Sequence, residues 1–279
     1  MNYKTIVVHM DRSARRAQRL DIALDMARTH DAHLVGLFAL STPRIPSYAL
    51  AEAGSTVLEQ LRLRQAEQAA EAEAEFRKAA ARHGVSTVEW RVSRQDAVGA
   101  ACLSARYADL LIAGQPEPAD AMPAGIAAGF HEELLLSTGG PVLFVPYAGR
   151  FERVGQRVLV AWDAGREAAR AVSDALPLLA RAAHVEVVVF DPEKSLAHGD
   201  VPGADISLYL ARHGVKASAA QLSGAGMDVG NQILSRAADL GSDLIVMGGY
   251  GHSRMRELML GGATRTVLET MTVPVLMSH

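Results

Sequence analysis

Glycines with the spacing of a phosphate-binding loop cluster near the carboxyl end of the chain. A short apolar run, from Leu244 to Met247, is typical of a buried strand. The glycines that follow it fall in two sets, Gly248, Gly249 and Gly251, then Gly261 and Gly262. A helix is expected to begin near Ala263 and Thr264. Glycines at a strand end let backbone N–H groups turn toward an anion, and a helix N-terminus adds partial positive charge. The spacing therefore predicts a site for a phosphate group or a nucleotide.

Three polar residues follow the first set of glycines. Arg254 offers a delocalised cation to phosphate oxygens, and Ser253 offers a hydroxyl beside His252. The same glycines have a second interpretation, because glycine also serves tight turns and close packing of a helix on a sheet. The residues themselves leave both a nucleotide site and a purely structural loop open.

An aspartate follows the first expected strand in each half of the chain. These residues are Asp11 and Asp163. A carboxylate accepts hydrogen bonds from an exocyclic amine or a ribose hydroxyl, so Asp163 is a candidate ligand residue. The alternative is that each aspartate caps the N-terminus of the helix that follows it.

The chain consists of two copies of one unit. Residues 81–85 return without change as residues 211–215, and three further matches keep the same order along the chain. The first copy carries 22 additional residues between Ser41 and Arg82, with a long helix expected from about Thr56. That helix should pack through one side, on apolar positions Leu58, Leu61, Ala66, Ala69, Ala70 and Ala80.

Short apolar strands alternate with helical patterns in both copies. The first copy is expected to have strands at Thr5–Met10, Leu34–Leu40, Val88–Val92, Leu110–Ala113 and Val142–Val145. The second is expected to have them at Val158–Trp162, Val185–Phe190, Ala217–Leu222, Leu244–Met247 and Val273–Met277. This alternation predicts two α/β domains, 1–149 and 150–279, each with a five-stranded, mainly parallel sheet and helices on both faces. Asp163 and the glycine loop should then meet at the carboxyl ends of their strands.

The corresponding loop of the first copy has lost the glycine spacing. Residues 115–120 contain two prolines, which lack backbone donors, and two carboxylates, which repel phosphate. Gly139 and Gly140 fall after the expected helix rather than at its start. The first copy is therefore expected to keep the fold without a nucleotide triphosphate site.

Composition and charge narrow the class of protein. The 279 residues carry a formal net charge of -3 without a basic cluster the size of a protein face, so no nucleic-acid partner is expected. No apolar run reaches the length of a membrane helix, and the N-terminal run is too short for a signal peptide. Cys102 is the single cysteine, so we expect no disulfide within the chain. The histidines lack the spacing of metal ligands, so we expect no metal site. A cytoplasmic protein is the expected class.

Several histidines have structural explanations. His83 and His213 each precede a glycine where a helix is expected to end, and a cationic group favours a helix C-terminus. His9 lies inside a strand and is expected in the core. Cys102 is expected to be a small buried apolar side chain.

Taken together, these features resemble the universal stress protein family in its tandem form, with two Rossmann-like domains in one chain. The ATP-binding branch of that family has the pattern Gly-x2-Gly-x9-Gly-Ser/Thr, which Gly248, Gly251 and Gly261 match. Gly262 stands where the pattern has a hydroxyl residue, and Thr264 lies two positions on. The resemblance implies that Asp163 binds the adenine or ribose end of a nucleotide, and that Ala263 and Thr264 lie beside its phosphates.

Three functions compete. The resemblance implies a stress-response protein that binds ATP or a related adenine nucleotide in the second domain and acts through its conformation or partners. The chain offers no convincing base or nucleophile beside the loop, so we expect no enzyme beyond slow ATP hydrolysis. The alternatives are a nucleotide-free scaffold, or an enzyme such as a slow nucleotide hydrolase. A dinucleotide-dependent oxidoreductase is disfavoured because the Gly-x-Gly-x-x-Gly turn after the first strand is missing.

The fifth strands also predict how the copies assemble. Val142–Val145 and Val273–Met277 are apolar and would expose unpaired backbone at a sheet edge. Single-domain members of the family dimerise through this strand, so the resemblance implies an intrachain pseudo-dimer. A homodimer of the whole chain is compatible with the sequence.

Overall fold

The structure is a computed structural model, and it describes residues 1–40, 47–115, 129–191, 203–224, 226–251 and 262–279. For residues 47–58 it describes the backbone alone. His252, Ser253, Arg254 and Gly261, predicted to belong to the nucleotide site, therefore lie outside the described residues.

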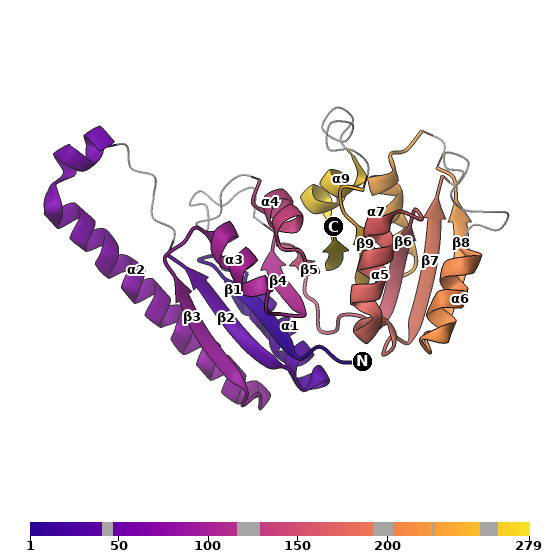
Figure 1. The fold of residues 1–279 in the computed structure, drawn as a ribbon, viewed down its shortest axis with the longest axis horizontal. Coiled ribbons are helices and arrows are strands. Elements are labelled where there is room, and N and C mark those ends of the chain that lie inside the picture. The colour runs from indigo at the N-terminus through magenta and orange to yellow at the C-terminus, as the bar shows by residue number, and fades with distance from the viewer. Residues whose placement is uncertain (41–46, 116–128, 192–202, 225, 252–261) are drawn as a thin grey trace.

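Each copy alternates strands with helices as the sequence predicts (Figure 1). The first copy comprises β1 (Thr5–Met10), α1 (Arg16–His30), β2 (His33–Ala39), α2 (Ser47–His83), β3 (Val88–Ser93), α3 (Ala97–Ala105), β4 (Leu110–Gly114), α4 (Phe130–Ser137) and β5 (Val142–Val145). The second comprises β6 (Arg157–Trp162), α5 (Arg166–Leu179), β7 (His184–Phe190), α6 (Ala204–Arg212), β8 (Ala217–Leu222), α7 (Val229–Asp239), β9 (Leu244–Gly248), α9 (Ala263–Thr270) and β10 (Val275–Ser278).

The five strands of each copy join into one ten-stranded sheet. Its order is β3-β2-β1-β4-β5-β10-β9-β6-β7-β8. β5 and β10 run antiparallel, with Leu143 opposite Leu276, while the other neighbouring strands are parallel. The two edges expected to expose apolar backbone are thus paired with each other inside the chain.

Helices cover both faces of this sheet. One buried apolar cluster contains residues of α1, α2, α5 and α6, and the second contains residues of α3, α4, α7 and α9. The inner strands β1, β4, β5, β9 and β10 are nearly continuous apolar runs because both of their faces are covered. The edge strands β3 and β8 carry polar and exposed residues. The carboxyl ends of the parallel strands of both copies lie along the same edge of the molecule, at the top of Figure 1.

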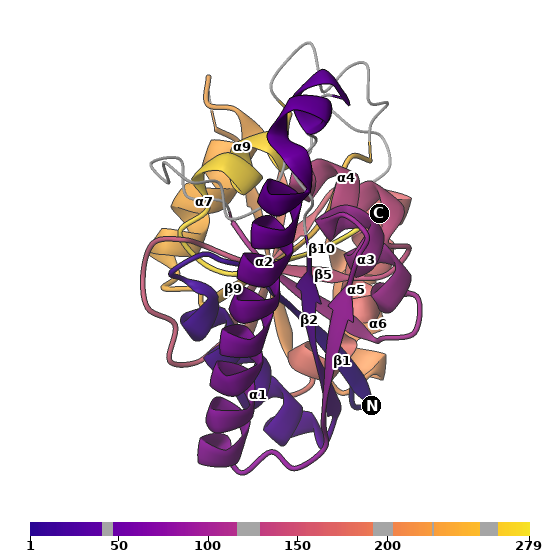
Figure 2. The same ribbon diagram turned by 90° about the vertical axis from the view of Figure 1, so that its left-hand side faces the viewer.

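The long helix α2 differs from its prediction in two respects (Figure 2). It begins at Ser47 rather than near Thr56. The predicted stripe is wrong for Ala66 and Ala70, which are exposed. Among the side chains of residues 59–83, the buried ones are Ala69, Ala72, Phe76, Ala79 and Ala80. The buried face centres on Phe76, which the predicted stripe does not include and whose ring centroid lies 5.4 Å from that of Trp90 on β3.

The structural explanations for the histidines and the cysteine are confirmed. Gly84 and Gly214, which follow His83 and His213, adopt left-handed φ angles of +69° and +76°. This is the conformation that glycine supplies where a helix ends. His9 is 2% exposed and Cys102 is buried on α3. Within the described ranges, no helix has both the length and the apolar character to cross a membrane.

Candidate functional site

The structure brings the described part of the predicted site together at the carboxyl ends of β6 and β9. Asp163 directly follows β6, and Gly248 ends β9. A Cβ built on Gly251 would stand 3.9 Å from Asp163 Oδ2, so the aspartate faces the glycine loop. Gly262 precedes α9, which begins at Ala263, as the sequence predicts.

Asp163 shapes the turn between β6 and α5. Its Oδ1 accepts a hydrogen bond from Gly165 N–H at 2.8 Å, and Gly165 is itself the N-cap residue of α5. Asp11 accepts from Ser13 N–H at 2.9 Å in the same way in the first copy. The N-cap interpretation is therefore wrong in detail: both carboxylates hold the turn that leads into the helix. Because the Oδ1 bond is local, Oδ2 of Asp163 remains directed at the loop.

A second carboxylate, Glu167, lines the loop, and sequence reasoning missed it. Its side chain is 5% exposed, and its Oε2 would lie 2.9 Å from a Cβ on Gly251. Burial raises the pKa of Glu167, but hydrogen bonds from Arg166 and from backbone outweigh that effect and leave the pKa below its ordinary value. The site thus presents two carboxylates, Asp163 and Glu167, beside Gly251.

Two of the loop glycines are required by packing. A Cβ on Gly248 would stand 2.5 Å from Ala168 N and 2.7 Å from the Glu167 carbonyl carbon, both of them backbone atoms of α5. A Cβ on Gly249 would overlap the Leu135 side chain of α4, which belongs to the first copy. Part of the glycine pattern therefore serves close helix–sheet contact whether or not a ligand binds.

Gly248→Ala should consequently destabilise the protein in the absence of any nucleotide. The added methyl meets backbone that cannot move without shifting α5, so we expect a loss of about 1–3 kcal/mol in unfolding free energy. In Gly251→Ala the methyl meets the far ends of the Glu167 and Asp163 side chains rather than backbone, so this variant should cost much less. Urea unfolding of both variants without ligand tests this, and equal losses would contradict the packing argument.

Thr264 holds the glycine loop against α9. Its side chain is buried, and its Oγ1 accepts the Tyr250 N–H at 3.1 Å. Tyr250 has a φ of +56°, a left-handed conformation that is uncommon for a side-chain-bearing residue. Gly249 O accepts a hydrogen bond from His279 Nδ1 at 2.9 Å. The loop is thus fixed on both sides of Tyr250, and Gly262 caps α9 without a side-chain hydrogen bond.

In the first copy an arginine fills the corresponding place. Arg19 of α1 has a side chain that is 2% exposed, and its Nη2 lies 2.8 Å from Asp11 Oδ1. Its Nε donates to His9 O at 2.8 Å. A Cβ on Gly114, at the end of β4, would overlap the guanidinium. Burial alone would raise the pKa of Asp11, but the charge of Arg19 holds it below its ordinary value. This buried ion pair therefore occupies the end of β4 beside Gly114 in the first copy.

The sequence matches the model of the universal stress protein family over residues 2–121 and 155–279. The chain belongs to the universal stress protein family. The match falls on the two copies in turn, so the chain is a tandem universal stress protein. The search of curated proteins found no match.

Solved structures agree with this assignment. A universal stress protein from Archaeoglobus fulgidus DSM 4304 has a TM-score of 0.73 at 16% identity, covering 98% of this chain and 95% of its own. A functionally unknown protein from Pseudomonas aeruginosa PAO1 has a TM-score of 0.58 at 17% identity, covering 99% of this chain and 92% of its own. A universal stress protein in complex with cAMP covers 53% of this chain and 100% of its own, at 22% identity and a TM-score of 0.35. The first two of these similarities show the fold of this chain.

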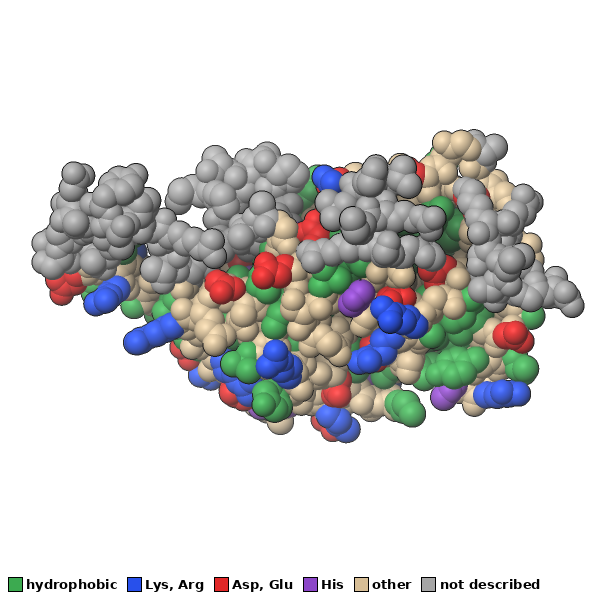
Figure 3. All heavy atoms as spheres, turned by 45° about the horizontal axis from the view of Figure 1, so that its top comes forward, with side chains coloured by type: hydrophobic (Ala, Val, Ile, Leu, Met, Phe, Trp, Pro, Cys, Tyr) green, Lys and Arg blue, Asp and Glu red, His purple; other side chains and the backbone are tan. Residues whose placement is uncertain are grey.

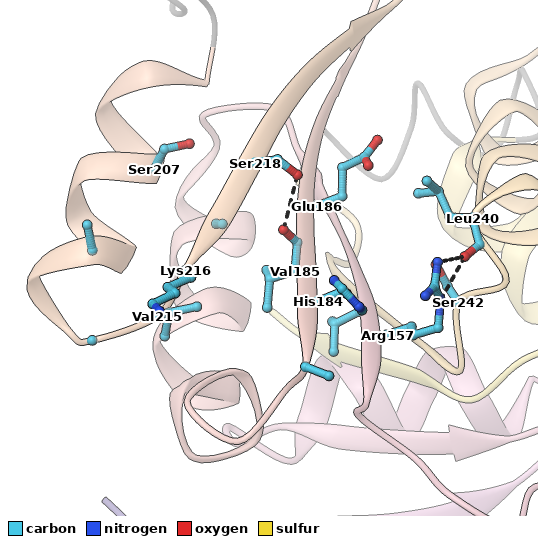
Figure 4. Close-up of a pocket in the computed structure, with 15 residues that line it drawn as sticks. Arg157, His184, Val185, Glu186, Ser207, Val215, Lys216, Ser218, Leu240 and Ser242 are labelled. Carbon is cyan, nitrogen blue, oxygen red and sulfur yellow. Dashed lines mark hydrogen bonds between the residues drawn. The ribbon is translucent and has the colours of Figure 1, made fainter.

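A cavity of about 850 Å³ lies at the opposite edge of this universal stress protein, at the amino ends of β6, β7 and β8 (Figure 4). The side chains that line it include Arg157, His184 and Lys216. The Arg157 guanidinium donates to Leu240 O from Nε at 3.0 Å and from Nη2 at 2.7 Å, and so satisfies the end of α7. Ligands of open α/β sheets bind beyond the carboxyl ends of the strands, so the candidate site stays at the other edge.

Figure 3 is turned to bring the top of Figure 1, the edge of the candidate site, forward. Lys, Arg, Asp and Glu side chains are intermixed among the described residues of this face. No group of three or more His, Cys, Asp or Glu residues within the described ranges has the arrangement of a metal site.

Proposed function

We propose that the second copy binds ATP or a related adenine nucleotide at the carboxyl ends of β6 and β9. The observation that carries this proposal is the difference between the copies at one equivalent place. Beside the aspartate that follows the first strand, the first copy holds the buried cation Arg19, whereas the second copy holds Gly251 and the carboxylate Glu167. The N-terminus of α9 follows Gly262 at the same edge of the second copy. Helix N-termini favour phosphate groups, because their first N–H groups have no partner within the helix.

The charges of the site orient the ligand in this proposal. Asp163 and Glu167 accept hydrogen bonds and repel phosphate, so the adenine and ribose, which carry donors, belong beside them. The phosphates belong at the other end, against the backbone of Gly262 and Ala263, with Arg254 and Ser253 completing the contacts. Binding of the nucleotide would then change the conformation or the partners of the protein. We expect no catalytic activity beyond slow ATP hydrolysis.

We further propose that the β5–β10 pairing replaces the strand pairing between two single-domain subunits. The antiparallel register of Val142 with Met277 and of Phe144 with Val275 supports this pseudo-dimer. We place the protein in the cytoplasm, and a homodimer of the full chain remains compatible with both proposals.

Titration with ATP tests the proposed site. We expect saturable binding by isothermal calorimetry and loss of binding in Gly251→Asp, which adds a third carboxylate beside Asp163 and Glu167. Gly140→Asp is the matched control, because a Cβ on Gly140 meets no atom within 4 Å and the residue lies in the first copy. Wild-type protein that fails to bind at millimolar ATP would overturn the proposal.

A nucleotide-free scaffold is the second candidate function, and one observation favours it. Gly262 lacks the hydroxyl that the family pattern has at this position. Native mass spectrometry of freshly purified protein separates the two candidates, because a co-purified adenine nucleotide would contradict a nucleotide-free scaffold.

A further inference from the structure

Gln115 is the first-copy residue that stands where the second copy has Gly249. Gly114 and Gly248 end β4 and β9 at matching positions of the repeat, so the next residue in each copy is equivalent. The backbone bonding agrees. Gln115 N–H donates to Val145 O at 2.8 Å, and Gly249 N–H donates to Ser278 O at 3.0 Å. The side chain is therefore what distinguishes the two positions.

The Gln115 side chain crosses from the first copy to the second. The residue is 8% exposed, and its Nε2 donates to Leu268 O at 2.8 Å and to Glu269 O at 3.0 Å. Its Oε1 accepts Tyr147 N–H at 3.3 Å. Both carbonyls belong to the last turn of α9, where helix carbonyls have no partner within the helix. One amide of the first copy thus satisfies the C-terminus of a helix of the second.

That helix carries the candidate site at its other end. α9 has eight residues, so about 12 Å separates its two ends. Its first turn follows Gly262 and includes Thr264, whose hydroxyl holds Tyr250 N–H. Any rotation or shift of the last turn moves the first turn as well, because a short helix moves as one body.

Contact also runs from the first copy to the loop itself. Leu135 of α4 occupies the space that a side chain on Gly249 would need. The first copy therefore touches the candidate site at two points, the loop through Leu135 and the helix through Gln115. The contact of Gln115 with α9 therefore links the first copy to the helix at the candidate site.

We propose that Gln115 is a positioning residue for the second copy's site: it fixes the last turn of α9 and thereby the placement of the N–H groups at its first turn. The inference rests on the proposed nucleotide site. It gives the first copy a role in that site although its own glycine loop is lost.

The test compares Gln115→Leu with Thr138→Val in the full chain. Thr138 is also a buried first-copy residue, and its hydroxyl donates to Gly140 O at 3.1 Å, a hydrogen bond that stays within the first copy. Two quantities are measured well below the unfolding temperature: the Kd for ATP, and hydrogen exchange of the α9 amides without ligand. We expect Gln115→Leu to raise the Kd about tenfold and to speed α9 exchange, while Thr138→Val changes neither.

The outcomes separate this inference from the proposed function. If wild type binds ATP and Gln115→Leu binds equally well, the inference is overturned and the nucleotide site stands. If wild type does not bind ATP, the proposed function is overturned. The positioning of α9 by Gln115 is then judged by hydrogen exchange alone, and unchanged exchange overturns it. Equal effects of Thr138→Val would also overturn it, because general loosening would explain them.

Discussion

Replacing Arg19 with methionine is expected to lower the unfolding free energy by about 3–5 kcal/mol, because it leaves Asp11 as a buried charge without its partner. Both side chains are 2% exposed, and the ion pair joins Nη2 to Oδ1 at 2.8 Å. The variant also removes the hydrogen bond to His9 O. Urea unfolding at neutral pH measures the loss.

Two further variants make this prediction specific. Arg77→Met breaks the exposed pair with Glu73, whose side chains are 56% and 36% exposed, and should cost less than about 1 kcal/mol. Arg19→Met combined with Asp11→Leu removes both charges and should recover most of the loss. A double variant as unstable as Arg19→Met alone would show that packing of the arginine stem, rather than the unpaired carboxylate, sets the effect.

The sequence predicts the inner strands well because they are apolar runs with both faces covered. The edge strands β3 and β8, which carry polar and exposed residues, are found because each strand of one copy has an equivalent in the other. The joining of the two sheets depends on contacts between residues far apart in the chain. The resemblance to single-domain dimers indicates that pairing, while strand patterns alone do not. The stripe of α2 is predicted less well. The buried face of α2 is the one on which Phe76 packs against Trp90, in space that is open because Gly36 has no side chain. Alanines occur on several faces of the helix, so the sequence does not indicate which face is buried.

The sequence alone nominates the glycines and Asp163 as candidate site residues, because the glycine spacing and the ends of the expected strands can be read from it. Glu167 is missed because an acidic residue in the first turn of a helix is the ordinary complement of the helix dipole. Arg19 is missed for a similar reason, as an arginine on an amphipathic helix is normally solvated. Only the tertiary structure shows that Gly114 leaves space for its guanidinium. The first copy thus buries an ion pair of Arg19 and Asp11 at this place, whereas the second copy buries the carboxylate of Glu167.

The buried histidines make the stability of the fold depend on pH. His9 is 2% exposed, and burial lowers its pKa from 6.5 to about 4. Arg19 and His131 lower the pKa further, and Asp11 opposes them. Burial also lowers the pKa of His30 to about 4. The pKa of His131 is likewise held below its ordinary value by burial. Below pH 6.5 the unfolded chain therefore binds protons that the folded protein excludes, so stability is complete above pH 6.5 and falls as the pH drops toward 4.

We expect the wild-type unfolding free energy to be level above pH 7 and to fall between pH 6.5 and 4, with His9 alone contributing about 2 kcal/mol of the fall at pH 5 and about 3 kcal/mol near pH 4. Urea unfolding at pH 7.5, 6 and 5 measures the slope. His9→Leu should flatten it by the His9 share, whatever its effect at pH 7.5. His184→Leu should keep the full slope, because that ring is exposed and water reaches it in both states. A wild-type protein equally stable at pH 5 and 7.5 would contradict burial of neutral histidines as the cause. Protonation of Asp11 should not contribute between pH 6.5 and 4, because its pKa is held below the ordinary value and the ion pair with Arg19 is lost only at more acidic pH.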